Sequence, residues 1–137
     1  MGFNTELNVC LIGDQMFRLL DDLEYENKDF IFTIKKGFVF DGASIPRVLW
    51  SSVGCPFGGL YTKPACLHDV LYATHLFSKE QSDLIFLEAM KSCDVEERLR
   101  ETIYSGVNLF GSKAYEEKEH IGKNREFLEI KSKGGLW

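Results

Sequence analysis

Two aspartates, a histidine and a tyrosine in the middle of the chain are of the types that carry out acid–base chemistry. His68 and Asp69 lie side by side, Tyr72 follows one helical turn after His68, and Asp83 lies on the apolar face of the next predicted helix. A carboxylate on an apolar face is costly to bury unless it has a partner. The pattern therefore predicts a hydrogen bond between Asp83 and His68, with the Tyr72 hydroxyl as a second donor. That bond leaves the other ring nitrogen of His68 to act as a base.

Asp69 indicates a metal site beside this pair. It lies about 100° around the helix from His68, which turns it toward the Gly-rich loop that begins at Asp41. A carboxylate combined with oxygens from an irregular loop is how proteins hold a hard cation such as calcium. An isolated His-Asp dipeptide is more often a capping or surface feature than a site. Here a functional site is favoured over a capping or surface feature, because His68, Asp69, Tyr72 and Asp83 are expected on facing helices. A Gly-rich loop with its own aspartate, Asp41, precedes them.

Two helices are expected to position these residues. The first spans about 64–76 and begins with a proline, which suits a first helical turn. Ser78 and Gln81 form a capping-box pattern for the second, which extends to about residue 93. Because the connection between them is short, the two helices are expected to form an antiparallel hairpin. The aspartate of the second then comes level with the histidine of the first, to within about a turn.

The chain as a whole is predicted to be a single α+β domain. Alternating residues and turn signals in 1–40 predict an N-terminal β-hairpin or small antiparallel sheet, and the Gly- and Pro-rich segment 41–63 predicts a structured loop. The segment 64–111 is the expected helical core, in which a third helix follows a cap at Asp94. The segment 112–137 is a polar tail with a short helix. Its apolar residues are expected to dock on the body or on a partner: Phe127, Leu128, Ile130 and Trp137.

Composition narrows the classes of function. The formal net charge of −5 argues against nucleic-acid binding, which uses clustered Lys and Arg. No run approaches the roughly 20 apolar residues of a transmembrane segment, and the N-terminus lacks the pattern of a signal peptide. The four cysteines are widely spaced, so we expect reduced thiols rather than disulfides or a zinc site.

Several motifs resemble those of known families. They are Asp-Gly-Ala-Ser-Ile-Pro from Asp41, Pro-Phe-Gly-Gly from Pro56, Leu-His-Asp-Val-Leu-Tyr from Leu67, Ser-Asp-Leu-Ile-Phe from Ser82, and Tyr-Ser-Gly-Val-Asn-Leu-Phe-Gly from Tyr104. The first three resemble an uncharacterised protein family of tailed phages and prophages. In order, the motifs also resemble, remotely, the prokaryotic and fungal branch of phospholipase A2. Together the resemblances cover about 40–111.

The phospholipase resemblance implies roles for the matching residues. It implies that calcium polarises an ester carbonyl while water attacks without a covalent intermediate. His68 resembles the base that activates the water, and Asp83 resembles the carboxylate that orients this histidine. Tyr72 resembles the tyrosine that supports the aspartate. The implied calcium ligands are Asp69, Asp41 and the carbonyl of Gly42.

This sequence departs from the phospholipase pattern in two places. Where secreted bacterial relatives have a disulfide between the calcium loop and the histidine-bearing helix, the corresponding positions here are Ala43 and Ala65. The loss of both cysteines fits a reducing compartment and loosens the loop that must hold calcium. The segment 1–39 has no counterpart in those enzymes.

Two functions follow as expectations. One is a phage-encoded, calcium-assisted hydrolase of a lipid or small acyl ester. The alternative is a non-catalytic phage accessory protein on the same fold, either a virion component or a host-directed, anti-defence binding protein with a phage or host protein as partner. We expect either protein in the host cytoplasm or the virion. A His-Asp metal phosphohydrolase is disfavoured because the chain lacks suitably placed additional histidines. The binding surface of the accessory protein would consist of the loop aromatics Trp50, Phe57 and Tyr61, with Arg47 and Lys63. The alternative role of the three aromatic side chains is to close the core under the loop.

Overall fold

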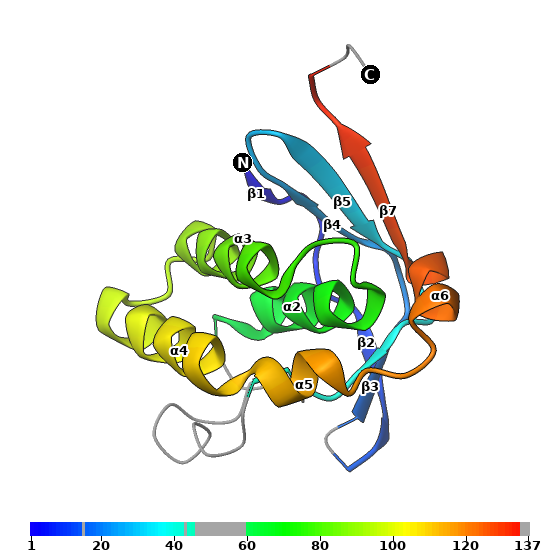
Figure 1. The fold of residues 1–137 in the computed structure, drawn as a ribbon. Coiled ribbons are helices and arrows are strands. Elements are labelled where there is room, and N and C mark those ends of the chain that lie inside the picture. Colours follow the sequence, from blue (N-terminus) through cyan, green and yellow to red (C-terminus); the bar gives the residue numbers. More distant parts are fainter. Residues whose placement is uncertain (15, 43, 46–59, 135–137) are drawn as a thin grey trace.

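The chain begins with short strands, continues with helices and ends with one more strand (Figure 1). A computed structural model describes residues 1–14, 16–42, 44–45 and 60–134. The predicted α+β class is confirmed. The elements are β1 (Gly2–Phe3), β2 (Val9–Gly13), β3 (Met16–Leu19), β4 (Leu23–Glu26), β5 (Phe30–Ile34), β6 (Val39–Phe40), α2 (Thr62–Thr74), α3 (Lys79–Ser92), α4 (Glu97–Phe110), α5 (Ser112–Glu116), α6 (Ile121–Asn124), the 3₁₀ turn η2 (Arg125–Phe127) and β7 (Leu128–Ser132).

The strands form two antiparallel sheets. The larger has the order β1-β4-β5-β7 and the smaller the order β2-β3-β6. The predicted N-terminal sheet is therefore present, but its fourth strand comes from the C-terminal tail. There Leu128 and Ile130 alternate with Glu129 and Lys131, and Ile130 pairs with Phe32 of β5. Because the alternation is so short and its neighbours are charged, this strand was not predicted.

Helices α2 and α3 form the predicted antiparallel pair. The capping box at the start of α3 is confirmed: Gln81 N–H donates to Ser78 Oγ at 3.1 Å, and Ser78 N–H donates to Gln81 Oε1 at 3.1 Å. The predicted cap of the third helix is wrong. Asp94 has a φ of 58° and its N–H donates to the Lys91 carbonyl. It therefore ends α3, and Glu96 precedes the first residue of α4.

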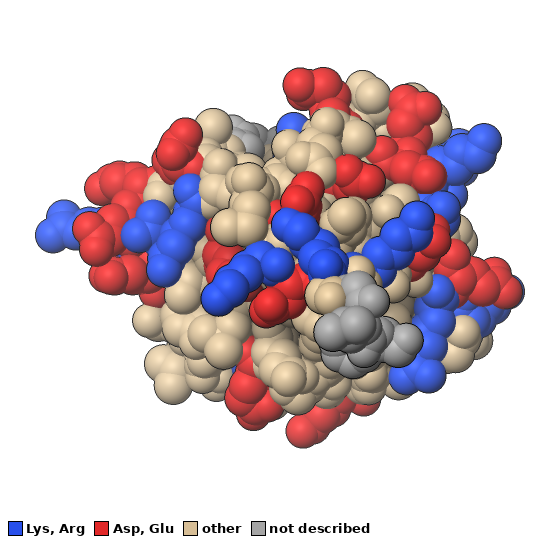
Figure 2. Space-filling model, turned by 90° about the horizontal axis from the view of Figure 1, so that it is seen from above, with Lys and Arg blue, Asp and Glu red and all other residues tan. Residues whose placement is uncertain are grey.

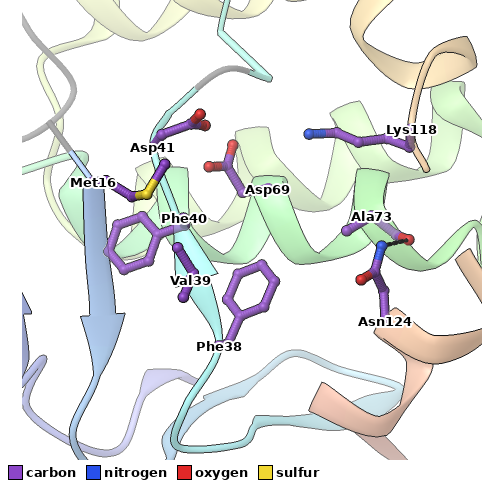
Figure 3. Close-up of a pocket in the computed structure, with 9 residues that line it drawn as sticks. All are labelled: Met16, Phe38, Val39, Phe40, Asp41, Asp69, Ala73, Lys118 and Asn124. Carbon is purple, nitrogen blue, oxygen red and sulfur yellow. Dashed lines mark hydrogen bonds between the residues drawn. The ribbon is translucent and has the colours of Figure 1, made fainter. Parts of the chain in front are cut away.

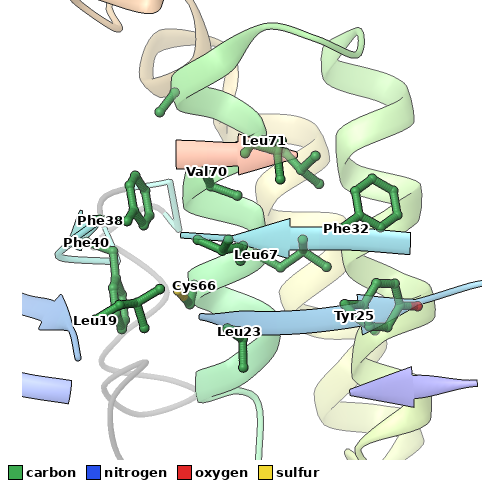
Figure 4. Packing of buried hydrophobic residues seen from close by; sticks show 14 of the residues in the cluster. Leu19, Leu23, Tyr25, Phe32, Phe38, Phe40, Cys66, Leu67, Val70 and Leu71 are labelled. Carbon is green, nitrogen blue, oxygen red and sulfur yellow. The ribbon is translucent and has the colours of Figure 1, made fainter. Parts of the chain in front are cut away.

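Helix α2 is the central element, and every residue from Pro64 to Thr74 in it is buried. Its sheet-facing side packs against residues of β4 and β5 (Figure 4). Its other side packs toward α3 and α4, where a second, smaller apolar cluster lies around Phe86 and Met90. A helix covered on all sides is expected to be apolar all round, so the polar residues within α2 stand out. The sheet-facing side chains of α2 are Cys66, Leu67, Val70 and Leu71.

The outer surface carries charges of both signs. In the view of Figure 2, Lys and Arg side chains are interspersed with Asp and Glu side chains. Such mixing is typical of a solvated surface.

Candidate functional site

The predicted pair of His68 and Asp83 lies in the interior between α2 and α3. His68 Nε2 is 2.8 Å from Asp83 Oδ1, and the Tyr72 hydroxyl donates to the same oxygen at 2.7 Å. All three side chains are fully buried. The imidazole lies between the rings of Tyr72 and Phe86, at centroid distances of 4.2 and 4.3 Å. The predicted hydrogen bonds are confirmed, and packing fixes the orientation of the histidine ring.

Lys79 completes the surroundings of Asp83. Its ammonium donates to Asp83 Oδ2 at 2.8 Å, and to the carbonyls of Val107 and Asn108 at 3.0 and 3.2 Å. Since those carbonyls belong to the last turn of α4, Lys79 joins the start of α3 to the end of α4. Burial acts to raise the pKa of Asp83, but the bonds from His68, Lys79 and Tyr72 outweigh it and lower the pKa. Asp83 is therefore a carboxylate at neutral pH.

Ser44 contacts the ring nitrogen of His68 that was predicted to act as a base. His68 Nδ1 is 2.9 Å from Ser44 Oγ, and the same hydroxyl is hydrogen-bonded to Asp69 Oδ1. Ser44 is fully buried. Asp83, His68, Ser44 and Asp69 therefore form one continuous hydrogen-bonded series, which we call the polar chain.

Asp69 anchors the loop that follows β6 to helix α2. Its Oδ2 accepts the Gly42 N–H at 2.8 Å, and its Oδ1 accepts the Ser44 N–H at 3.3 Å. Burial raises the pKa of this carboxyl and the nearby Asp41 carboxylate adds to the rise. The bonds from Ser44 and Gly42 and the charge of Lys118 oppose it. Asp69 is thus a carboxyl group that takes up a proton more readily than an exposed aspartate.

Two of the three predicted calcium ligands accept hydrogen bonds from the loop after β6. Calcium takes six to eight oxygen ligands. Asp69 already accepts loop hydrogen bonds on both oxygens, and the predicted Gly42 carbonyl accepts the Ile45 N–H at 2.9 Å. Within the ranges that the structure describes, no group of three or more His, Cys, Asp and Glu side chains is placed to hold a metal ion. Calcium binding by Asp41, Gly42 and Asp69 stays a prediction.

A pocket of about 200 Å³ lies beside Asp69. In Figure 3 the carboxylates of Asp41 and Asp69 face each other near β6 and α2, and the Lys118 side chain extends toward Asp69 from the other side. The polar chain therefore begins in the interior and ends at the wall of a pocket. The remaining lining residues are Met16, Phe38, Val39, Phe40, Ala73 and Asn124.

Some expected binding residues fall elsewhere. Trp50, Phe57 and Arg47 lie outside the described residues. Tyr61 is 4% exposed and packs in the smaller apolar cluster, so it belongs to the core. Lys63 donates to the Thr5 carbonyl at 3.0 Å and lies 3.7 Å from Glu6 Oε2, which ties the start of α2 to the N-terminal segment.

Two members of the polar site were missed by sequence reasoning. Lys79 precedes Asp83 by one helical turn, the spacing at which oppositely charged side chains pair on a helix, so a signal was available. Ser44 belongs to the Asp-Gly-Ala-Ser motif, but nothing in the sequence assigned a role to its hydroxyl. Its contact with His68 depends on the path of the loop after β6.

The fold and site define an α+β protein in which a buried histidine of the central helix pairs with an aspartate of the next helix and is connected to a small pocket. The chain belongs to the family described as Protein of unknown function (DUF1353), whose model matches residues 17–107. That range includes all four members of the polar chain.

A relative from a bacterium shares part of this sequence. The chain is 28% identical over 97 residues to the "Uncharacterized protein y4jT" of Sinorhizobium fredii. The match covers 70% of this chain and 29% of the relative, so the chain spans less than a third of that protein. No solved structure matches the chain. In the described part of the chain, none of the helices has the length and apolar character that a membrane crossing requires.

Proposed function

We propose that this protein hydrolyses a small carboxylic ester in the pocket beside Asp69, with the polar chain as its acid–base centre. The observation that carries the proposal is the unbroken series from Asp83 through His68 and Ser44 to Asp69, which ends at the pocket wall. Perturbed carboxyl groups connected to a histidine and facing a pocket are typical of catalytic sites.

Counting protons supports a shared proton in the polar chain. The Ser44 hydroxyl has one hydrogen and therefore donates to only one neighbour. Either His68 Nδ1–H donates to Ser44 and Ser44 donates to Asp69, or a protonated Asp69 donates to Ser44 and Ser44 donates to His68. In both arrangements Nε2–H donates to Asp83. Because the two arrangements hold the same number of protons, transfer of one proton through Ser44 is enough to interconvert them.

Asp69 is then the group that exchanges protons with the substrate. As a carboxylate it accepts a proton from water in the pocket, and the water oxygen bonds to the ester carbonyl carbon. When the tetrahedral intermediate collapses, the bond from this carbon to the alcohol oxygen breaks, and Asp69 returns the proton to that oxygen. His68 and Ser44 position Asp69 through their hydrogen bonds.

This route differs from the expected direct action of His68 on water. The Ser44 hydroxyl lies against Nδ1, and the imidazole is fully buried, so water reaches Asp69 more easily than His68. The route uses no calcium. The pocket of about 200 Å³ is below the usual range of ligand pockets, which favours a short acyl ester over a long-chain lipid. On the basis of the family resemblance, we also propose that the protein is phage-encoded and acts in the host cytoplasm or in the virion.

Complete burial favours a second candidate function. His68, Ser44 and Asp83 are each 0% exposed, as expected for a network that stabilises the interior. Under this alternative the protein is the non-catalytic accessory protein, and the pocket binds a ligand or a partner without chemistry.

Hydrolysis of p-nitrophenyl esters of increasing acyl length separates the two functions. We expect the wild type to prefer short esters, and Asp69→Asn to lower kcat/KM by about 10²- to 10⁴-fold because it removes the acid–base group. The matched control is Asp29→Asn, since Asp29 is an exposed residue in a turn. Full activity in Asp69→Asn contradicts the mechanism. A folded wild type without activity toward any ester supports the accessory protein.

A further inference from the structure

Lys118 is the only cation among the described residues that line the pocket. It lies opposite the wall formed by Asp41 and Asp69 (Figure 3). Within the part of the chain that the structure describes, no hydrogen bond or ion pair holds its ammonium group, and its charge acts on Asp69 across the pocket. An ammonium without a fixed partner at the edge of a pocket is available to a ligand.

The residues that precede Lys118 are anchored to the end of α2 and to the connection that follows it. His75 Nε2 is 2.7 Å from the Tyr115 carbonyl oxygen, and the two rings stack at a centroid distance of 3.9 Å. The Tyr115 hydroxyl donates to the Phe77 carbonyl at 2.8 Å. These contacts place the start of the segment against the connection between α2 and α3.

The residues that follow Lys118 are also anchored to the end of α2. Asn124 Nδ2 donates to the carbonyls of Ala73 and Glu119 at 3.0 and 2.9 Å, and Arg125 Nε donates to the Thr74 carbonyl at 2.8 Å. The Ala73 and Thr74 carbonyls belong to the last turn of α2, where no intrahelical donor remains. Because Lys118 lies between these two sets of contacts with α2, its backbone is held beside the pocket.

The pocket is consequently dipolar, with carboxylates on one wall and an ammonium on the other. We propose that Lys118 is a catalytic residue that binds the carbonyl oxygen of the ester and stabilises the negative charge on it as water adds. The inference rests on the proposed hydrolysis. A charged donor aimed at the developing oxyanion acts strongly in a site with few other donors, and it orients the carbonyl carbon toward water on Asp69. The same group binds the carboxylate of the product acid.

Two measurements on Lys118→Met, Lys118→Arg and the control Lys113→Met test this role. Lys113 is an exposed lysine of α5, so its replacement removes the same charge away from the pocket. We expect Lys118→Met to lower kcat/KM by about 10²- to 10³-fold, Lys118→Arg to retain part of the activity, and Lys113→Met to match the wild type. A thermal unfolding midpoint equal to that of the wild type shows that each variant is folded.

Calorimetric titration with butyrate, a short product acid, tests the site without turnover. We expect Lys118→Met to weaken butyrate binding at least tenfold, and Asp69→Asn to leave it unchanged or strengthen it because a like charge is removed. Wild-type kcat/KM and butyrate affinity in Lys118→Met would overturn the inference while leaving the hydrolase intact. A wild type that cleaves no ester overturns the proposed function and the catalytic role. Butyrate binding then still decides whether Lys118 forms an anion site.

Discussion

The two sides of α2 are buried to the same extent but are built from opposite kinds of residue. On the side facing the sheet, Leu67 and Leu71 are fully buried among apolar side chains. On the side facing α3, His68 and Tyr72 are fully buried against the carboxylate of Asp83. Burial is favourable for the first side and costly for the second unless every polar group has a partner. The polar side therefore persists because its partners form a complete set.

The comparison also separates how each side responds to change. Apolar packing depends on volume and tolerates exchanges of similar size. The polar chain depends on particular atoms, since each member satisfies its neighbours. In the described ranges, the only buried side-chain N or O atoms without a hydrogen-bond partner are Ser82 Oγ and Arg100 Nε. Neither residue belongs to the polar chain.

The largest effect is expected from Asp83→Leu. This variant leaves His68, Tyr72 and Lys79 without their shared carboxylate, and breaking a buried ion pair in this way costs about 3–5 kcal/mol. The matched change on the sheet side, Leu71→Met, should cost less than about 1.5 kcal/mol. Urea unfolding at pH 7 measures both. Equal losses would show that the two sides do not differ.

A smaller loss is expected from Gly111→Ala at the end of α4. A Cβ atom there would lie 2.4 Å from the Val107 carbonyl oxygen and 2.9 Å from the Tyr72 hydroxyl oxygen, so both the last turn of α4 and the hydroxyl that donates to Asp83 would have to shift. We expect a loss of about 1–3 kcal/mol, as for other overpacked sites.

Gly122→Ala is the control for that substitution. Gly122 lies in α6, and a Cβ atom there has nothing within 4 Å. Because alanine favours helices, we expect no loss and up to about 1 kcal/mol of gain. A loss in Gly122→Ala equal to that in Gly111→Ala would mean that close contact with Val107 and Tyr72 is not the cause.

The two carboxyl groups of the polar chain should give pH dependences of opposite sign. The folded pKa of Asp83 is lowered, so its contribution to stability is present above the unfolded value of about 3.9 and is lost as the pH falls toward the folded value. The folded pKa of Asp69 is raised, so its contribution is full below about 3.9 and is lost as the pH rises through the folded value.

Denaturant unfolding of Asp69→Asn and Asp83→Asn between pH 3 and pH 7 checks this contrast. Relative to the wild type, Asp69→Asn should gain stability as the pH rises above about 3.9, whereas Asp83→Asn should lose stability as the pH rises from 3 toward 3.9. Parallel curves for the two variants would contradict the assigned directions.

Sequence reasoning reached the parts of the site that local spacing determines. The capping box at Ser78 and the short connection placed α3 against α2, and the cost of burying Asp83 predicted its bond to His68. Ser44 was not assigned because its contact joins a loop to a helix far along the chain. The same limit applies to Lys118, whose position depends on the hydrogen bonds between the tail and the last turn of α2.

In the fold, the predictions failed where a pattern was short or ambiguous. The predicted docking of Leu128 and Ile130 on the body is confirmed. Strand β7 itself was not predicted, because it has only two buried or half-buried apolar residues. Asp94 has the residue type of a helix cap, but its left-handed backbone ends α3. In both cases tertiary packing decided between structures that the local sequence allows.

Nitrogen-15 NMR of the His68 ring tests most directly whether the polar chain shares a proton with Asp69. We predict that Nε2 remains protonated in the wild type and in Asp69→Asn, because it donates to Asp83 in both. The Nδ1 signal should shift strongly in Asp69→Asn, where the shared proton is lost, and should not shift in Asp29→Asn. An Nδ1 signal that is the same in Asp69→Asn and the wild type would contradict the account.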